Sequence, residues 1–230
     1  MADIAAFTWS VVIPVKVLAQ AKSRLGLLGD ARRAELALAM ATDTATAVLE
    51  CPGVARVIVI TDDQVAGATM AKLGALVIPD EPGAGLNAAL RHGAAHVRAH
   101  WPASGVAALS ADLPALRPAD LSAALTAAAA SALAGVPTAF VADAPGDGTT
   151  LYTARPGAAF SPAFGLASRA RHAAGGAAEL DVPGIAGLRR DVDTPEDLRT
   201  AAALGLGPNT APIAADLLSR GVRGDASPRS

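Results

Sequence analysis

Cysteine, aromatic side chains and long apolar runs are all scarce in this chain. Its one cysteine, Cys51, excludes an intrachain disulfide and a zinc site of clustered cysteines, and it suits a reducing compartment. Aromatic residues make up 3% of the sequence, so small and aliphatic side chains, alanine above all, must fill the core. No run of about 20 apolar residues occurs, which argues against a membrane-spanning helix.

An excess of charge of either sign is absent too. The formal net charge is −2 and no long basic run occurs, whereas nucleic-acid-binding proteins usually carry a strong positive balance. The first ten residues lack the basic segment and the apolar run of a signal peptide. We therefore expect a cytoplasmic protein that binds neither nucleic acid nor a membrane.

Short β-branched runs and stretches of strong helix formers alternate through the first half of the chain. The expected strands are 10–15, Val54–Ile60, 75–78 and 106–110. The expected helices are Asp30–Leu49, Gln64–Leu73, Leu86–His100 and Pro118–Leu133, the first of them capped by Asp30. This alternation predicts an α/β fold with one doubly wound, mostly parallel sheet.

From residue 138 the alternation breaks down. Strands are expected at 138–141 and 149–153 around a Pro-Gly turn, as a β-rich insertion, followed by a helix at 164–172. A strand at 188–192 and a helix at 194–204 come next, the helix capped by Thr194. We assign 1–210 to one domain and 211–230 to a C-terminal appendage whose end, 225–230, is expected to be disordered.

Polar clusters follow each of the first four expected strands. They are 16–24, 61–63, 80–87 and Asp112. In open α/β sheets, ligands bind outside the carboxyl ends of the strands. Four successive clusters in that position predict a single ligand site.

The first of these clusters is basic. Lys16, Lys22 and Arg24 place three cations within nine residues, where they could grip a triphosphate or form an ordinary solvated loop. The cluster lacks the GxxxxGK[ST] sequence of a P-loop, and the chain lacks the GxGxxG of a dinucleotide fold. If the loop binds phosphates, it therefore does so in another way.

Carboxylates form the second candidate group. Asp112 directly follows an apolar strand, where it could hold Mg²⁺ against phosphate oxygens or serve as a turn residue. Asp191 and Asp193 would point the same way from an extended segment, although Asp193 could instead cap the next helix. Either of these two aspartates is a candidate second metal ligand.

Glycines, hydroxyls and histidines give weaker signals. Gly85 and Asn87 begin a helix, where the backbone can approach a planar base and Asn87 could read its edge or only shape the loop. Thr150 and the segment 164–168 offer hydroxyls and amides for a second anion. The histidines at 92, 96 and 100 share a helix face without an HExxH motif, and we interpret that face as solvated or interfacial.

Taken in order, these motifs resemble one family. The matching segments are Pro14-Val15-Lys16, Ala21-Lys22-Ser23-Arg24-Leu25, Gly85-Leu86-Asn87, Ala111-Asp112-Leu113-Pro114, Gly148-Thr149-Thr150, Phe164-Gly165 and Asp191-Val192-Asp193-Thr194-Pro195-Glu196-Asp197-Leu198. Over about residues 11–204 the chain is similar to the phosphoenolpyruvate or 2-phospho-L-lactate guanylyltransferases of coenzyme F-420 biosynthesis. Its high alanine and arginine content is typical of actinobacterial proteins, among which the phosphoenolpyruvate form is expected.

The resemblance implies a fold of the nucleotide-diphospho-sugar transferase type and a Mg²⁺-dependent reaction of GTP with phosphoenolpyruvate. The products would be enolpyruvoyl-2-diphospho-5′-guanosine and pyrophosphate. The roles it implies are phosphoenolpyruvate binding by Thr150, Gly165 and Ser168, phosphate binding by Lys16, Lys22 and Arg24, guanine binding by Gly85 and Asn87, and metal binding by Asp112 with Asp193 or Asp191. Phosphoryl transfer needs positioning and charge neutralisation more than a protein nucleophile, in keeping with these residue types.

Other interpretations stay open at this point. A molybdenum-cofactor or sugar nucleotidyltransferase would share the fold and Asp112, and the acceptor could be 2-phospho-L-lactate or 3-phosphoglycerate. A glycosyltransferase would normally show Asp-x-Asp where Asp112 stands alone. A non-catalytic nucleotide-binding regulator would not need metal-poised acids. The oligomeric state is not determined by the sequence, and a homodimer is left open.

Overall fold

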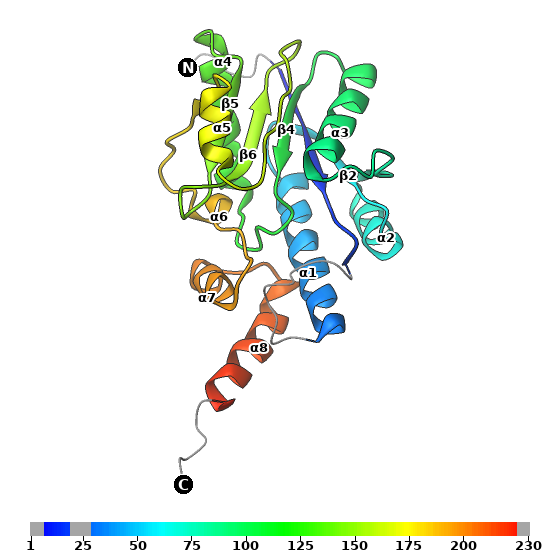
Figure 1. The fold of residues 1–230 in the computed structure, drawn as a ribbon, viewed down its shortest axis with the longest axis vertical. Helices are drawn as coiled ribbons and strands as arrows, with labels where there is room; N and C mark the ends of the chain where they lie inside the picture. The colour runs from blue at the N-terminus through cyan, green and yellow to red at the C-terminus, as the bar shows by residue number, and fades with distance from the viewer. Residues whose placement is uncertain (1–6, 19–28, 225–230) are drawn as a thin grey trace.

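One mixed β-sheet organises the chain, seen in a computed structural model that describes residues 7–18 and 29–224 (Figure 1). The strand order is β3-β2-β1-β4-β6-β5-β7. The strands are β1 (Trp9–Pro14), β2 (Val54–Ile60), β3 (Leu76–Ile78), β4 (Gly105–Leu109), β5 (Thr138–Ala142), β6 (Thr149–Ala154) and β7 (Ala178–Glu179). This confirms the predicted α/β class and mostly parallel sheet.

One strand of the sheet, β6, runs in the opposite direction to the others. β1 to β4 are mutually parallel, so their carboxyl ends share one edge. β6 runs antiparallel to both of its neighbours, β4 and β5, because a short turn reverses the chain after β5. The β-rich segment predicted after residue 138 therefore extends the same sheet, with β6 inserted directly beside β4.

Helices cover both faces of the sheet. They are α1 (Asp30–Leu49), α2 (Gln64–Leu73), α3 (Leu86–His100), α4 (Pro118–Leu133), α5 (Ser168–Ala174), α6 (Ala186–Arg189), α7 (Pro195–Leu204) and α8 (Thr210–Gly224). Along β1, Val11 and Ile13 pack with α1, α2 and α4, whereas Val12 packs with α3 on the opposite face. The two cores thus follow the period-two alternation of a strand buried on both sides.

A glycine in α3 allows this helix to approach the sheet closely. At Gly93 of α3, an added Cβ would lie 2.5 Å from a methyl group of Val12 and 3.0 Å from Ile60. Helix α3 therefore lies directly against β1 and β2.

Two local predictions are wrong. Gly29, not Asp30, is the N-cap of α1. The expected strand at 188–192 is instead the short helix α6 followed by irregular chain. Leu188 is buried in α6, whereas Val192 is buried in the irregular chain after it, where its amide donates to the Asp112 carbonyl at 3.1 Å.

The C-terminal residues from 211 form most of a helix that the sequence analysis did not predict. Helix α8 packs on α1 through its first residues and then extends away from the sheet (Figure 1). The buried Asp43 carboxylate of α1 accepts hydrogen bonds from the amides of Asn209 and Thr210 and from the Asn209 side chain, at 2.7–3.0 Å. Residues 225–230 lie outside the described residues. None of the described helices is both long and apolar enough to span a bilayer.

Candidate functional site

The polar clusters predicted to lie together do meet at the carboxyl ends of β1 to β4. The Leu18 amide, after β1, donates to Asp63 at 2.9 Å, and the Asp80 amide, after β3, donates to Asp62 at 2.9 Å. These bonds tie the loops that leave three neighbouring strands. Lys16 is exposed just after β1. The two other predicted cations, Lys22 and Arg24, lie outside the described residues.

Aspartates from separate segments converge beside the end of β4. We name Asp112, Asp143, Asp191 and Asp193 the acidic cluster. The Val192 amide donates to the Asp112 carbonyl at 3.1 Å, which brings the flanking aspartates 191 and 193 alongside Asp112. Burial, and then the charges of Asp112, Asp193 and Asp143, raise the pKa of Asp191 to about 7. The cluster therefore concentrates more negative charge than the apo protein accommodates easily.

The structure excludes helix capping as the role of these aspartates. Thr194 caps α7 through a capping box with Asp197, so Asp193 is not the cap. Helix α4 has its N-cap at Arg117, so Asp112 does not cap the helix that follows it. Neither Asp112 nor Asp193 is thus the N-cap of the helix that follows it.

Asp143 was missed by the sequence analysis. Its carboxylate accepts hydrogen bonds from the amides of Gly146, Asp147 and Gly148 at 2.8–3.0 Å, which closes the turn between β5 and β6. An added Cβ at Gly148 would lie 2.2 Å from this carboxylate, so the turn needs glycine there. An aspartate followed by a Pro-Gly turn was the available signal, but it indicates a turn more directly than a site.

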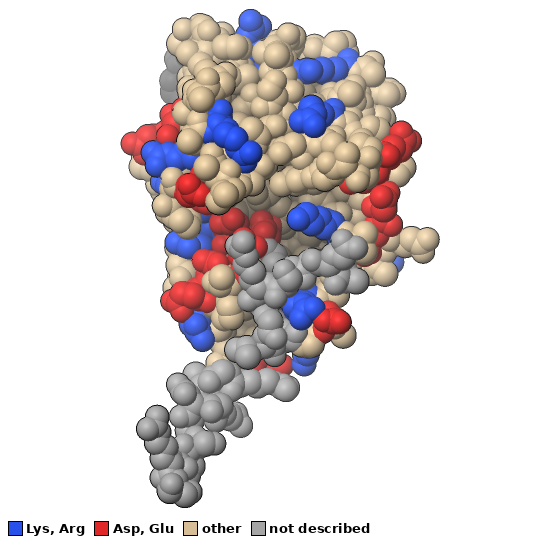
Figure 2. Space-filling model, in the orientation of Figure 1, with Lys and Arg blue, Asp and Glu red and all other residues tan. Residues whose placement is uncertain are grey.

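The donor set of the acidic cluster suits a hard divalent cation. Carboxylate oxygens are the protein ligands Mg²⁺ prefers, and Mg²⁺ often uses only one or two of them together with water and substrate phosphates. Within the described ranges, no three histidine, cysteine or acidic side chains are arranged to hold a metal ion by themselves. Figure 2 shows acidic side chains gathered in a hollow in the middle of one face, below the sheet. The residues fit a cation that brings part of its own coordination shell.

Removal of one charge from the cluster should stabilise the metal-free protein. The raised pKa means that the folded state holds the Asp191 proton more tightly than the unfolded chain, whose carboxyl titrates near 3.8. That stability is fully present below pH 3.8 and is lost as pH rises through about 7. In a chelator, Asp191→Asn should therefore raise the Tm by several degrees at pH 8 and much less at pH 5, since 1 kcal/mol is roughly 2–4 °C here.

Thermal unfolding of Asp191→Asn at the two pH values tests this expectation. The matched control is Asp181→Asn, which alters an exposed aspartate outside the acidic cluster. Equal Tm shifts for Asp191→Asn at pH 5 and pH 8 would show that Asp191 is ionised without cost in the folded protein.

Buried hydroxyls lie next to the acidic cluster. Thr150 of β6 is fully buried, and its hydroxyl has no hydrogen-bond partner. The Ser110 amide donates to the Thr150 carbonyl at 3.0 Å, which places Thr150 beside the end of β4, two residues before Asp112. A buried hydroxyl without a partner is rare because its desolvation is not compensated. Such a group is suited to receive a polar ligand atom.

The other two residues predicted with Thr150 lie close together, at the end of the connection from β6 and at the start of α5. Gly165 has φ +109°, a conformation that favours glycine, and Ser168 is the buried first residue of α5. Ala167 also has a positive φ, of 52°. The turn is held within the protein, because the Ala167 amide donates to the Asp147 carboxylate at 3.3 Å and the Ser168 amide donates to the Gly165 carbonyl at 3.0 Å.

Asn87 connects this segment to the glycine loop before α3. Its side-chain oxygen accepts from the Phe164 amide at 2.8 Å, and its side-chain nitrogen donates to the Phe164 carbonyl at 3.0 Å. The loop of Gly85 and the segment of Gly165 are therefore neighbours. The sequence analysis did not predict this connection, because nothing local relates residues 87 and 164.

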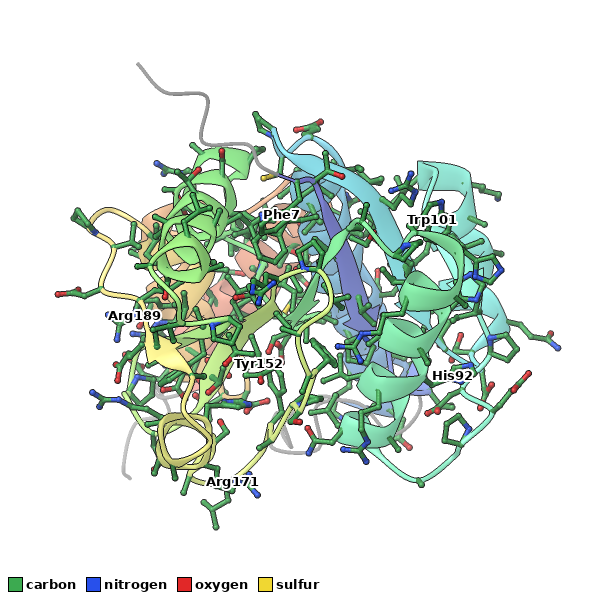
Figure 3. The ribbon with its side chains drawn as sticks, turned by 90° about the horizontal axis from the view of Figure 1, so that it is seen from above. Phe7, His92, Trp101, Tyr152, Arg171 and Arg189 are labelled. Atoms are coloured by element: carbon green, nitrogen blue, oxygen red, sulfur yellow. The ribbon has the colours of Figure 1, made fainter. Side chains whose placement is uncertain are left out.

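The three histidines of α3 lie away from these residues. The rings of His96 and His100 stack at 4.1 Å between centroids, next to Trp101. Burial, and then the charges of His100 and His92, lower the pKa of His96. Figure 3 shows His92 on α3 and Trp101 just after it, on the far side of the sheet from Arg189. His100 is exposed and His92 and His96 are partly exposed, so this face of α3 meets solvent.

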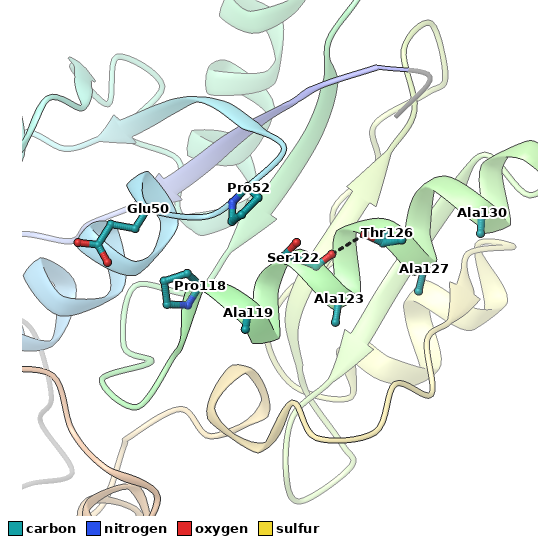
Figure 4. Close-up of a pocket in the computed structure, with 9 residues that line it drawn as sticks. All are labelled: Glu50, Pro52, Pro118, Ala119, Ser122, Ala123, Thr126, Ala127 and Ala130. Atoms are coloured by element: carbon teal, nitrogen blue, oxygen red, sulfur yellow. Dashed lines mark hydrogen bonds between the residues drawn. The ribbon is translucent and has the colours of Figure 1, made fainter. Parts of the chain in front are cut away.

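A groove of about 840 Å³ on the outside of α4 is also separate from the acidic cluster (Figure 4). Its lining is mostly small side chains of one helix face, with Glu50 and Pro52 at one end. It contains none of the residues predicted to bind a ligand, and it has no converging charged groups. The candidate site is therefore the edge formed by the acidic cluster, the buried Thr150 and the glycine loops.

Comparison with known proteins identifies a family and a type of fold. A family model described as "Guanylyl transferase CofC like" matches residues 9–205. A Thermomonospora curvata protein named phosphoenolpyruvate guanylyltransferase is 60% identical over 211 residues, covering 92% of this chain and 90% of the relative. The fold resembles that of a Desulfovibrio desulfuricans G20 protein described as a nucleotide-diphospho-sugar transferase, with TM-score 0.62, 16% identity, and 88% and 92% of the two chains covered. It also resembles a Mycobacterium tuberculosis H37Rv protein solved with manganese, at TM-score 0.50 and 21% identity, covering 85% and 98% of the chains.

Proposed function

This chain belongs to the CofC-like guanylyl transferase family, and we propose on that basis that it joins GMP from GTP to phosphoenolpyruvate. The products are enolpyruvoyl-2-diphospho-5′-guanosine and pyrophosphate, within coenzyme F-420 biosynthesis. The observation that carries the proposal is the acidic cluster beside the unpartnered, buried Thr150 hydroxyl, at the sheet edge where nucleotidyltransferase-like folds bind ligands.

The reaction requires charge neutralisation more than proton transfer. A phosphate oxygen of phosphoenolpyruvate attacks the α-phosphorus of GTP, and the bond from that phosphorus to the bridging oxygen of the β-phosphate breaks. Pyrophosphate leaves with the electron pair. The attacking oxygen is already anionic, so no general base is needed, and the protein has to align two highly charged substrates in line.

Cations of the first loop are proposed to hold the triphosphate. Lys16 is exposed at the carboxyl end of β1, where a nucleotide at the sheet edge is within reach of its ammonium group. We assign the same role to Lys22 and Arg24 from the family resemblance. The guanine base is proposed to lie at the loop of Gly85 and Asn87. The Asn87 amide keeps a second N–H and a second lone pair besides the two bonds to Phe164.

The acidic cluster is proposed to hold Mg²⁺ through Asp112 and Asp193, with Asp191 adjacent. When bound, the ion would neutralise phosphate charge and orient the phosphates for in-line displacement. The elevated pKa of Asp191 supports this assignment, because a cation in the cluster would favour the ionised carboxylate that like charges and burial now disfavour.

Thr150, Gly165 and Ser168 are proposed to bind the acceptor. Thr150→Val or Ser168→Ala removes one neutral hydroxyl next to a charged ligand, which costs about 1.5–3 kcal/mol. Each variant should therefore raise the phosphoenolpyruvate KM, or lower turnover, by roughly 10- to 100-fold while GTP affinity stays nearly unchanged. Thr126→Val and Ser122→Ala, on the outer face of α4, are the matched controls.

Steady-state kinetics with each substrate varied separately test these acceptor variants. If GTP binding weakens while the acceptor constants stay unchanged, Thr150 and Ser168 belong to the nucleotide half of the site. The acceptor would then bind elsewhere along the sheet edge.

Pyrophosphate release tests the proposed function as a whole. The purified chain with Mg²⁺ should release pyrophosphate from GTP only when an acceptor is present, with phosphoenolpyruvate preferred in competition against 2-phospho-L-lactate and 3-phosphoglycerate. Faster reaction with either competitor would reassign the acceptor. GTP binding without pyrophosphate release in the presence of any of the three would favour a nucleotide-binding regulator instead.

A further inference from the structure

His172 of α5 makes two hydrogen bonds that determine its tautomer. The Ala163 amide donates to Nε2 at 2.8 Å, and Nδ1 lies 3.0 Å from the Thr149 hydroxyl. A backbone N–H can only donate, so Nε2 carries no proton and Nδ1–H is the donor to Thr149. The imidazole is therefore neutral, with each ring nitrogen bound to a different segment of the chain.

Aromatic rings enclose this imidazole. Tyr152 stacks on it at 4.6 Å between centroids, and Phe164 and Phe140 contact it at 5.5 and 5.6 Å. His172 is 2% exposed. Burial, and then the nearby charge of Arg171, lower its pKa to about 4, so the ring keeps the same tautomer near neutral pH. Figure 3 shows Tyr152 between α5 and the loop after β6, with Arg171 on α5.

The partners of His172 adjoin the three residues proposed to bind the acceptor. Thr149 precedes Thr150, Ala163 lies two residues before Gly165, and Ser168 begins the helix that carries His172. These segments are far apart in sequence, and the ring holds them in one arrangement. The tight turn at Gly165 and Ala167, with its two positive φ angles, has to be maintained by such surroundings.

We propose that His172 is a positioning residue that holds the acceptor-binding segments in register, an inference that rests on the proposed function. Both ring nitrogens are occupied and the ring is covered, so His172 neither touches the acceptor nor exchanges a proton with it. It acts through Thr149 and Ala163, and its loss should affect acceptor binding more than nucleotide binding.

A set of His172 variants separates the two bonds. His172→Phe keeps a packed ring and loses both hydrogen bonds. His172→Asn can place an amide N–H near the Nδ1 position toward Thr149, and His172→Gln can place a carbonyl near the Nε2 position toward Ala163. We expect His172→Phe to raise the acceptor KM about 10- to 100-fold with the GTP Kd changed less than about twofold. Asn and Gln should each recover part of that loss.

Thr149 supplies a matched background. In Thr149→Val the partner hydroxyl is absent. In that background the acceptor KM of His172→Asn should be no lower than that of His172→Phe, whereas the acceptor KM of His172→Gln should still be lower. Thr149→Val alone is the variant to use if His172→Phe does not fold. Amide hydrogen exchange gives a readout without substrate: the Ala163 amide should exchange faster in His172→Phe and Asn than in wild type and Gln.

The outcomes separate this inference from the proposed function. A purely structural role would lower the active fraction, so kcat would fall with both substrate constants unchanged, and the inference would be overturned. Equal weakening of acceptor and GTP binding would overturn it too. If wild type proves inactive with phosphoenolpyruvate, the proposed function fails, and the same KM comparison is made with whichever acceptor supports turnover. If no acceptor supports turnover, hydrogen exchange of the Ala163 amide decides: an unchanged rate in His172→Phe overturns the inference, and a faster rate supports it.

Discussion

Asp112→Asn is expected to reduce turnover at least about 100-fold while changing the Tm by only a few degrees. Asparagine has nearly the same shape as aspartate but cannot supply the negative charge that would hold Mg²⁺ at the end of β4. The backbone carbonyl of residue 112, which accepts from the Val192 amide, is unchanged by the substitution. Loss of one metal ligand should cost several kcal/mol of transition-state stabilisation.

The measurement is kcat at saturating GTP and phosphoenolpyruvate over a range of Mg²⁺ concentrations, together with thermal unfolding. Asp181→Asn, an exposed aspartate outside the acidic cluster, is the control and should retain wild-type activity. More than about a tenth of wild-type activity in Asp112→Asn would contradict the metal assignment. The variant also removes one of the charges that raise the pKa of Asp191, so that pKa should fall.

GTP should be preferred to ATP by at least about 100-fold in kcat/KM. Guanine and adenine differ at the N1, C2 and C6 positions of the purine edge. A site whose groups pair with guanine leaves buried donors or acceptors unpaired when adenine enters, which costs several kcal/mol. In the proposed arrangement this edge is read at the loop of Gly85 and Asn87, where Gly85 has φ +88° and carries no side chain to block the base.

Rates with the two nucleotides at a fixed, saturating acceptor concentration test this preference. Equal kcat/KM values for GTP and ATP would contradict the assignment of guanine as the base and the role given to Gly85 and Asn87. Asn87→Ala refines the result, since its amide also holds Phe164. Loss of nucleotide discrimination in this variant would indicate base reading, whereas a higher acceptor KM with discrimination retained would indicate that Asn87 mainly supports the acceptor segment.

Local interactions explain which parts of the fold were predictable. The bounds of α1, α3, α4 and β2 follow from helix-former runs, breakers and one β-branched strand, and the structure has them where the sequence predicts. The Thr194-Pro195 start of α7 is also local, because the capping hydrogen bonds form within four residues. The family motifs are short segments of the same kind, so their order could be recognised without a structure.

Pairing across the sheet was not predictable in the same way. The insertion of β6 between β4 and β5 brings Thr150 beside the end of β4, yet the sequence pattern of β6 would fit several neighbours. Asp143 was missed because its turn places it beside residues far away in the chain. The strand predicted at 188–192 failed because Leu188 and Val192 are buried in different local structures, α6 and the irregular chain after it, which the apolar pattern does not distinguish.

By itself, therefore, the sequence determined the class of fold, most element bounds, the family and the candidate residues, all of which depend on neighbours along the chain. Only the tertiary structure decided that Asp191 sits among like charges, that Asn87 bonds Phe164, and that His172 joins Thr149 to Ala163. The pKa of a carboxyl and the tautomer of an imidazole depend on the charges, donors and burial around them in space. Those surroundings come from segments that no local pattern relates, so they exist only once the chain has folded.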